Sequence, residues 1–278
     1  MLEAPDRRPV ARAVRWLAGR SSWVLFAIFL AWFIVWTVAA FLVLDAIVEA
    51  ERQTDLSAVA GSMMGAVGAL FAFLTGFVIA SEWAQHRDAE HTIGMEADAC
   101  VRLAWASAAP HCDGVAIRTD LAAYLRSVID HEWTHLEAGA YSSPATHDRI
   151  TELQGRIRVI ASDRDVPPTV AGDLTQAVDA VSVTRAHRCN VARHDLPAPL
   201  FLLAFVAGVV LVLTAVALAL RLHGGDAVVL GGIVVTIALD LALLVAISVP
   251  FTGSLAVRPA TLEHVLEDLE TGRYGPLA

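Results

Sequence analysis

The sequence contains no lysine, so all twenty of its basic residues are arginines. Charged residues make up only 18% of the chain, and the formal net charge is −9. A surface that binds nucleic-acid phosphates needs clustered basic groups, which this charge balance does not provide. We therefore predict no nucleic-acid partner. Exclusive use of Arg, together with abundant Ala, Val and Leu, is typical of proteins from GC-rich bacterial genomes.

Cysteine is also scarce. The three cysteines, Cys100, Cys112 and Cys189, form no CxxC pair, which argues against a disulfide framework and against a thiolate zinc site. We interpret them as reduced, buried small residues. A Walker A motif, a nucleophile elbow and a dinucleotide fingerprint are absent as well. The sequence therefore predicts no cofactor, no resident metal and no enzyme.

Long apolar segments dominate what remains. The chain is 56% hydrophobic, with a mean hydropathy of +0.58, which is typical of membrane proteins. A helix that crosses a bilayer needs about 20 consecutive apolar residues. Four segments meet this requirement: 23–44, 57–80, 200–220 and 227–249. The first is too long for the apolar core of a signal peptide, so we interpret it as a retained span.

Arginine placement predicts the orientation of these spans, because cytoplasmic flanks are enriched in basic residues. An N-terminal arm carries five arginines: Arg7, Arg8, Arg12, Arg15 and Arg20. The loop "DAIVEAERQTDL" after the first span holds four acidic residues and only one arginine. We therefore predict a multi-pass protein of the bacterial inner membrane with both termini in the cytoplasm.

This topology divides the chain into five parts. They are a basic cytoplasmic arm (1–22), the first two transmembrane helices (23–81), a cytoplasmic helical domain (82–197), the last two transmembrane helices (198–250) and a cytoplasmic tail (251–278). In the cytoplasmic domain, a helix continues the second span as far as Pro110. Three more are predicted: one over 114–138, one from Pro144 to Ala161 with Ser143 as N-cap, and one from Thr169. The predicted fold is an all-α integral membrane protein with four transmembrane helices.

The segment "HEWTH" (131–135) matches the H-E-x-x-H pattern of zinc metallopeptidases. His131 and His135 would bind the metal and Glu132 would be the general base. The site also needs a third ligand, for which the candidates are His147, Asp148 and Glu152. The favoured interpretation is structural: Glu132 lies on the apolar line of its helix and would be a buried carboxylate paired with an arginine such as Arg156 or Arg185. The metallopeptidase is kept as the least favoured hypothesis.

Asp240 lies near the centre of the fourth span. An ionised carboxylate there costs about 2.5–3.5 kcal/mol on insertion scales, so it is not expected to face lipid. One hypothesis is a hydrogen bond with Ser62 or Thr37 on a neighbouring span. The other is an ion or proton pathway.

Four blocks of sequence resemble the bacterial bestrophin-like domain family. The first is "GALFAFLTGFVIASEWAQHRDAEHTIGMEADACVRLAW", and the second, "LAAYLRSVIDHEWTHL", holds Tyr124, Glu132 and Trp133. The third, "LTQAVDAVSVTRAHRCNVARHDLPAPLF", leads into the third span. The fourth, "VPFTGSLAVRPATLEHVLEDL", holds Pro250, Phe251 and Gly253. On this resemblance these six residues are structural elements of the family motif, and the flanking histidines are incidental.

Bestrophins are oligomeric anion channels, so the resemblance implies a homo-oligomeric ion channel or channel-like pore that passes inorganic ions. It places Ala69, Phe73 and Phe77 in the pore neck, although these residues could instead pack against lipid or a neighbouring helix. The acidic calcium clasp of bestrophins has no recognisable counterpart, so calcium activation is not implied. The alternative function is a non-conducting membrane scaffold or sensor whose cytoplasmic domain binds a partner protein.

Overall fold

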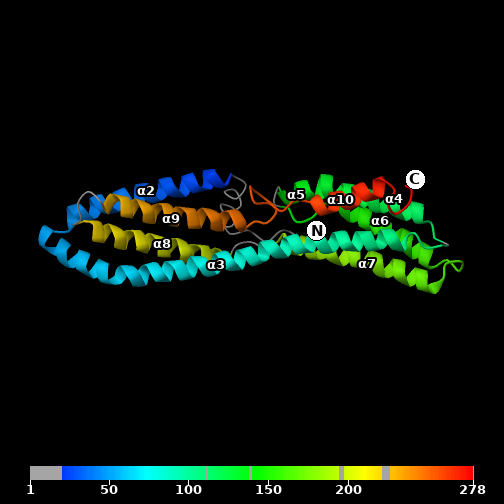
Figure 1. Ribbon diagram of the computed structural model, residues 1–278, viewed down its shortest axis with the longest axis horizontal. Helices are drawn as coiled ribbons and strands as arrows, with labels where there is room; N and C mark the ends of the chain where they lie inside the picture. Colours follow the sequence, from blue (N-terminus) through cyan, green and yellow to red (C-terminus); the bar gives the residue numbers. More distant parts are fainter. Residues whose placement is uncertain (1–20, 111, 138–139, 194–196, 221–225, 278) are drawn as a thin grey trace. The chain divides into compact units, whose positions relative to one another are not determined.

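The computed structural model describes residues 21–110, 112–137, 140–193, 197–220 and 226–277. Among these residues the structure is all-helical and has no strand (Figure 1). The arginines of the predicted N-terminal arm (Arg7, Arg8, Arg12, Arg15 and Arg20) lie outside the described residues, as does most of the turn between the third and fourth spans. The chain divides into two compact units, which we describe separately.

The first unit comprises the described residues of 1–84, 195–249 and 253–255. It contains α2 (Ser22–Ile47), the first half of α3 (Ala50–Ala106), α8 (Ala198–Ala219) and α9 (Asp226–Ile247). Each of these four helices is long and apolar enough to cross a membrane, so the four predicted spans are confirmed as helices. Some of these helices are longer than the predicted apolar segments; α2, for example, extends three residues beyond the end of the segment 23–44. Only Val48 and Glu49 separate α2 from α3, where the sequence predicts a twelve-residue loop.

Small residues allow the helices of the first unit to pack closely. Gly208 of α8 is the clearest case: a Cβ atom at this position would lie 3.0 Å from Ile237, 3.3 Å from Phe71 and 3.6 Å from Phe33. Glycine at this point lets α8 approach three other helices at one level of the bundle.

The second unit comprises the described residues of 85–194, 250–252 and 256–278. It contains the second half of α3, α4 (Gly114–Ser127), η1 (Val128–Glu132), α5 (Trp133–Glu137), α6 (Pro144–Ala161), α7 (Pro168–Val191) and α10 (Ala260–Glu270). The predicted start of α6 is confirmed, with Ser143 as N-cap and Pro144 in the first turn. The predicted helix over 114–138 is confirmed as one helical stretch from Gly114 to Glu137, which contains a π-helical turn, η1, that the sequence did not predict.

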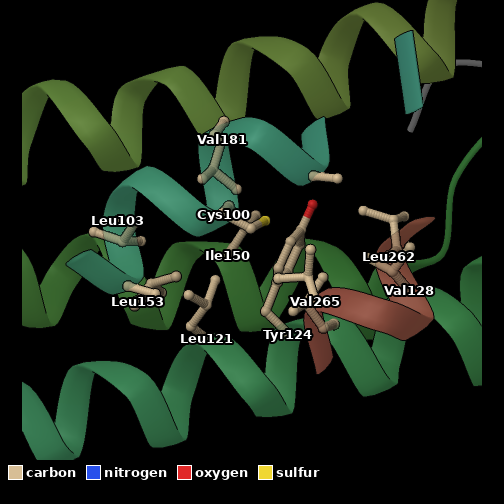
Figure 2. Close-up of a cluster of buried hydrophobic side chains, with 14 of the residues drawn as sticks. Cys100, Leu103, Leu121, Tyr124, Val128, Ile150, Leu153, Val181, Leu262 and Val265 are labelled. Carbon is tan, nitrogen blue, oxygen red and sulfur yellow. The ribbon is translucent and has the colours of Figure 1, made fainter. Parts of the chain in front are cut away.

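Side chains from every helical segment of the second unit form its apolar core. Figure 2 shows Cys100 and Leu103 of α3, Leu121 and Tyr124 of α4, and Val181 of α7. It also shows residues of η1, α6 and α10: Val128, Ile150, Leu153, Leu262 and Val265. The helix α10 was not foreseen from the sequence, which predicts a tail there. Its leucine and valine residues at helical spacing are buried in this core, so the C-terminal segment is part of the unit.

Candidate functional site

The helix α3 presents two different faces in the first unit. Phe71, Thr75 and Val78 are buried against the other helices. Phe73 and Phe77 are 71% and 60% exposed, and Ala69 is exposed as well. A spacing of four residues places Ala69, Phe73 and Phe77 on one stripe, nearly opposite the buried face. We call these three residues the α3 stripe.

Glycines beside the α3 stripe leave its surface open. A Cβ atom at Gly65 or Gly76 would have no heavy atom within 4 Å. The backbone of α3 is therefore accessible on this side to another helix or to a pore. By contrast, Gly61 and Gly68 face α8, where the nearest atoms are leucine methyl groups at 3.5 and 4.0 Å.

Asp240 of α9 is partly buried, and within the described part of the chain it makes no hydrogen bond or ion pair. The two hydrogen-bond donors suggested from the sequence bond elsewhere. Thr37 donates to the carbonyl oxygen of Phe33 at 2.6 Å, and Ser62 donates to that of Val59 at 2.8 Å. The predicted hydrogen bond from either residue is therefore wrong, because each hydroxyl satisfies a carbonyl of its own helix.

The second unit is organised around a buried guanidinium group. Arg188 of α7 is fully buried and forms ion pairs with two carboxylates that are buried as well. Its Nε donates to Glu96 at 2.6 Å and its Nη2 donates to Glu132 at 2.8 Å. Arg185, one turn earlier, donates to Glu132 at 2.6 Å, and Tyr124 donates to Glu96 at 2.5 Å. We call these five residues the ion-pair cluster.

The charges in the ion-pair cluster stabilise one another. Burial alone would raise the pKa of Glu132, but Arg188 and Arg185 together hold it below its ordinary value. Burial would lower the pKa of Arg188, and the two carboxylates raise it well above its ordinary value instead. Burial and the Glu96 carboxylate also raise the pKa of Tyr124. The Glu132 carboxylate and the two guanidinium groups therefore remain charged in the interior.

The π-helical turn η1 brings Glu132 into this cluster. The N–H of Trp133 donates to the carbonyl of Val128, five residues earlier, so the turn contains one residue more than an α-helical turn. Glu132 and Trp133 are then both buried. The Oε1 atom of Glu132, which accepts from Arg185, also accepts the backbone N–H of Ser143 at 3.2 Å, and this bond ties the start of α6 to the cluster.

An aromatic layer covers the ion-pair cluster. The Arg188 guanidinium group lies 5.6 Å from the centre of the Trp133 ring, and Phe251 packs edge-on against that ring at 5.7 Å. The loop that carries Phe251 is closed by a hydrogen bond of 2.8 Å from the Val257 N–H to the Pro250 carbonyl. Four of the residues predicted as structural motif elements therefore belong to one connected group around Arg188. Glu132 and Trp133 contact Arg188 itself, whereas Tyr124 joins through Glu96 and Phe251 through Trp133.

Gly253, the sixth residue of the predicted motif, has a φ of +88°. Residues with a side chain adopt this conformation at an energetic cost, which glycine avoids. The glycine therefore allows the chain to turn directly after Phe251.

The two histidines of "HEWTH" are exposed, and the Nδ1 atom of His135 lies 2.8 Å from the carbonyl oxygen of His131. Of the proposed third ligands, Glu152 pairs with Arg149 at 3.0 Å. Within the described ranges, no three His, Cys, Asp or Glu side chains are grouped closely enough to hold a metal ion. Glu132 itself is fully buried and paired with two arginines, so it is not placed to act as a general base.

The predicted pairing of Glu132 with Arg185 is confirmed, and the alternative with Arg156 is wrong, because Arg156 pairs with Asp120. Sequence reasoning missed the role of Glu96 and the central position of Arg188. A signal was present: Glu96 falls on the line of α3 residues whose other members are apolar and buried, including Ile93 and Cys100. A carboxylate on such a line is expected to have a buried basic partner.

Comparisons with known proteins agree with this architecture. The bestrophin-like domain model matches residues 31–262. Two solved structures of a bacterial bestrophin homologue from Klebsiella pneumoniae, each with one mutation, are similar to this chain. One has a TM-score of 0.69 at 15% identity and covers 87% of this chain and 96% of its own. The other has a TM-score of 0.66 at 16% identity and covers 88% and 98%.

A third structure of the same homologue, phased with zinc, has a TM-score of 0.65 at 16% identity. It covers 87% of this chain and 96% of its own. No curated protein matches the chain. The family model covers most of the sequence, including both units and the residues around Arg188, and the chain therefore belongs to the bestrophin-like domain family.

Proposed function

We propose that this protein is a homo-oligomeric ion channel of the bacterial inner membrane in which the α3 stripe lines the narrowest part of the pore. The exposure of that stripe carries the proposal. Phe73 and Phe77 are among the most exposed aromatic side chains of the first unit, although the opposite face of the same helix is well packed. Membership of the bestrophin-like family supports it.

A ring of such helices around a symmetry axis would bring one Phe73 and one Phe77 from every copy together. Rings of large apolar side chains restrict ion flow because water leaves a narrow apolar constriction. The stripe would thus act as a gate that opens when its aromatic side chains move apart. The adjacent Gly76 leaves space for such a movement.

The test is ion flux through protein reconstituted in liposomes or planar bilayers. Phe73→Ala and Phe77→Ala are expected to increase the current at equal protein density, because a wider and more hydrated neck conducts better. Leu202→Ala is the matched control, because Leu202 of α8 is 59% exposed but lies on a different helix. It should leave the current unchanged.

Absence of current under all tested ions, pH values and voltages, together with a monomer on purification, would contradict the proposal. Co-purification of a soluble protein at a fixed ratio would instead favour the scaffold or sensor function.

The orientation is part of the same proposal. We place the N-terminus and the second unit on the cytoplasmic side, because of the arginines before α2. Tags inserted at residue 10 and at residue 140 should both be protected in intact cells and accessible in inverted membrane vesicles. Tags on opposite sides of the membrane would contradict this topology.

A further inference from the structure

Two unpaired polar groups lie within the apolar spans of the first unit. Asp240 of α9 offers a hydrogen-bond acceptor, and the indole N–H of Trp32 on α2 offers a donor. Among the described residues, neither group makes a hydrogen bond. Both also reach the surface of the unit, since Trp32 is 41% exposed and Asp240 is only partly buried.

Lipid cannot satisfy either group. Trp32 follows Ser22, the first residue of α2, by ten residues, or about 15 Å of helix, which is near the middle of a 30 Å hydrocarbon layer. Asp240 precedes Ile247, the last residue of α9, by seven residues, or about 10 Å. Tryptophan in membrane proteins is enriched at the interface with water rather than at this depth. Carboxylates inside spans face protein or a water-filled cavity.

The two groups lie at nearly the same depth. Phe33 and Ile237 both lie next to Gly208, since a Cβ atom there would be 3.6 Å from Phe33 and 3.0 Å from Ile237. The two residues therefore mark one level of the bundle. The helices α2 and α9 are antiparallel: the start of α2 lines a groove with the end of α9, and the middle of α2 lines another with the beginning of α9. Trp32 and Asp240 are therefore displaced from this level in the same direction, by about 1.5 Å and 4.5 Å.

The direction of the side chains reduces this difference. Each Cα–Cβ bond of a helix tilts toward the N-terminus of that helix. Because α2 and α9 are antiparallel, the side chain of Trp32 leans toward the level of Asp240, and that of Asp240 leans toward the level of Trp32.

A ring of identical subunits around an axis along the membrane normal keeps every residue at one depth. Its contacts are between two different surfaces of the same chain. The donor lies on α2, where the Trp32 ring contacts Phe205 at 4.8 Å, and the acceptor lies on a different helix, α9. We infer that the indole of Trp32 in one copy donates a hydrogen bond to the Asp240 carboxylate of the next copy. This inference rests on the homo-oligomer of the proposed function.

Cross-linking tests the contact directly in the full-length protein, with Cys112→Ser as background because Cys100 and Cys189 are buried. The double variant Trp32→Cys/Asp240→Cys, treated with a short bifunctional thiol reagent in membranes, should give a ladder of covalent oligomers. A mixture of the two single variants should give dimers only. Trp36→Cys/Asp240→Cys is the matched control, since Trp36 stacks on Trp32 but lies one turn, about 5–6 Å, farther from the level of Asp240.

The hydrogen bond itself is tested by the stability of the oligomer in detergent. Trp32→Phe keeps the ring but removes the donor, and should weaken association by about 3- to 30-fold, the range for polar contacts between membrane helices. Asp240→Leu should weaken it similarly, and combining the two should add little. Asp240→Asn, which keeps an acceptor oxygen, and Trp36→Phe should retain the oligomer.

Three outcomes would overturn the inference. The first is an equal ladder from the Trp36 control. The second is rapid labelling of Asp240→Cys by a membrane-impermeant thiol reagent, which would place Asp240 on a water-filled pathway. The third is a conducting oligomer without the Trp32–Asp240 cross-link, in which case the proposed function stands and only the contact fails. A protein that is monomeric in membranes would contradict both the Trp32–Asp240 contact and the proposed function.

Discussion

Replacement of Arg188 by methionine should leave Glu96 as a buried carboxylate without a positive partner. Glu96 would keep only the hydrogen bond from Tyr124. Glu132 would still have Arg185 and the Ser143 N–H. Loss of one partner of a buried ion pair costs about 3–5 kcal/mol. Methionine fills much of the same volume under the aromatic layer, so the electrostatic loss should dominate.

Proton uptake limits the size of this loss. A glutamate with an ordinary pKa of about 4.3 costs about 3.7 kcal/mol to protonate at pH 7. A carboxylate that is destabilised by more than this amount takes up a proton instead. The cost of protonating the glutamate, which sets the upper limit of the destabilisation, falls to about 1 kcal/mol at pH 5. Arg188→Met should therefore destabilise the second unit by about 3–4 kcal/mol at pH 7, and much less at pH 5.

Labelling of Cys100 measures this loss in the intact protein. Cys100 is fully buried beside the ion-pair cluster, so a thiol reagent reaches it only when the unit opens. A destabilisation of 3.7 kcal/mol corresponds to labelling about 500-fold faster than in the wild type, and 1 kcal/mol to about fivefold. Cys112→Ser removes the more accessible thiol in all samples, and rates are compared with the wild type at each pH.

Two variants serve as controls. Glu96→Gln in the Arg188→Met background removes the unpaired charge and should recover most of the stability. Arg126→Met breaks an exposed ion pair with Glu270 and should cost less than about 1 kcal/mol. If Arg188→Met labels Cys100 at the wild-type rate, or if the ratio is the same at pH 7 and pH 5, the reasoning about the buried charge is refuted.

Three further predictions concern the packing and charge of both units. Tyr124→Phe should destabilise the second unit by about 1.5–3 kcal/mol, because its hydrogen bond to the ion-paired Glu96 side chain is lost. The same Cys100 labelling measures this loss, and an unchanged rate would refute it. Gly208→Ala should destabilise the first unit by about 1–3 kcal/mol through overpacking, measured by thermal unfolding in detergent, whereas Gly155→Ala, with no atom near its Cβ position, should be neutral or stabilising. The second unit should also lose stability at acidic pH. Because the pKa of Glu132 is lowered in the folded unit, its ionised carboxylate stabilises the unit at pH values above the ordinary pKa of 4.5. This stabilisation is lost as the pH falls through the lowered pKa. Glu132→Gln should flatten this acidic limb, and an unchanged limb would argue against the assignment.

The membrane-spanning helices could be predicted from the sequence because a single property, apolar length, determines them. The start of α6 was predictable for a similar reason, since Ser143 and Pro144 are a local signal. The helix α10 was missed because it is short and mostly charged on its outer face, so its three buried residues identify it only once the core they join is known.

The site was predictable only in part, because its partners come from distant parts of the chain. The sequence indicated that Glu132 is buried and that it pairs with an arginine. The choice between Arg185 and Arg156 depended on the packing of α6 and α7 against α4, which no local pattern encodes. The π-helical turn was equally hidden, since its extra residue leaves the apolar pattern of Leu121, Leu125 and Val128 unchanged before the turn.

That π-helical turn makes the length of the segment as important as its composition. If the same five residues formed ordinary α-helix, everything after them would rotate by about 100° around the helix axis. Trp133 would then leave its place over the guanidinium group even though every letter of the motif was intact. A homologue with one residue fewer between Val128 and Trp133 would instead need an ordinary α-helix here to keep the tryptophan in place.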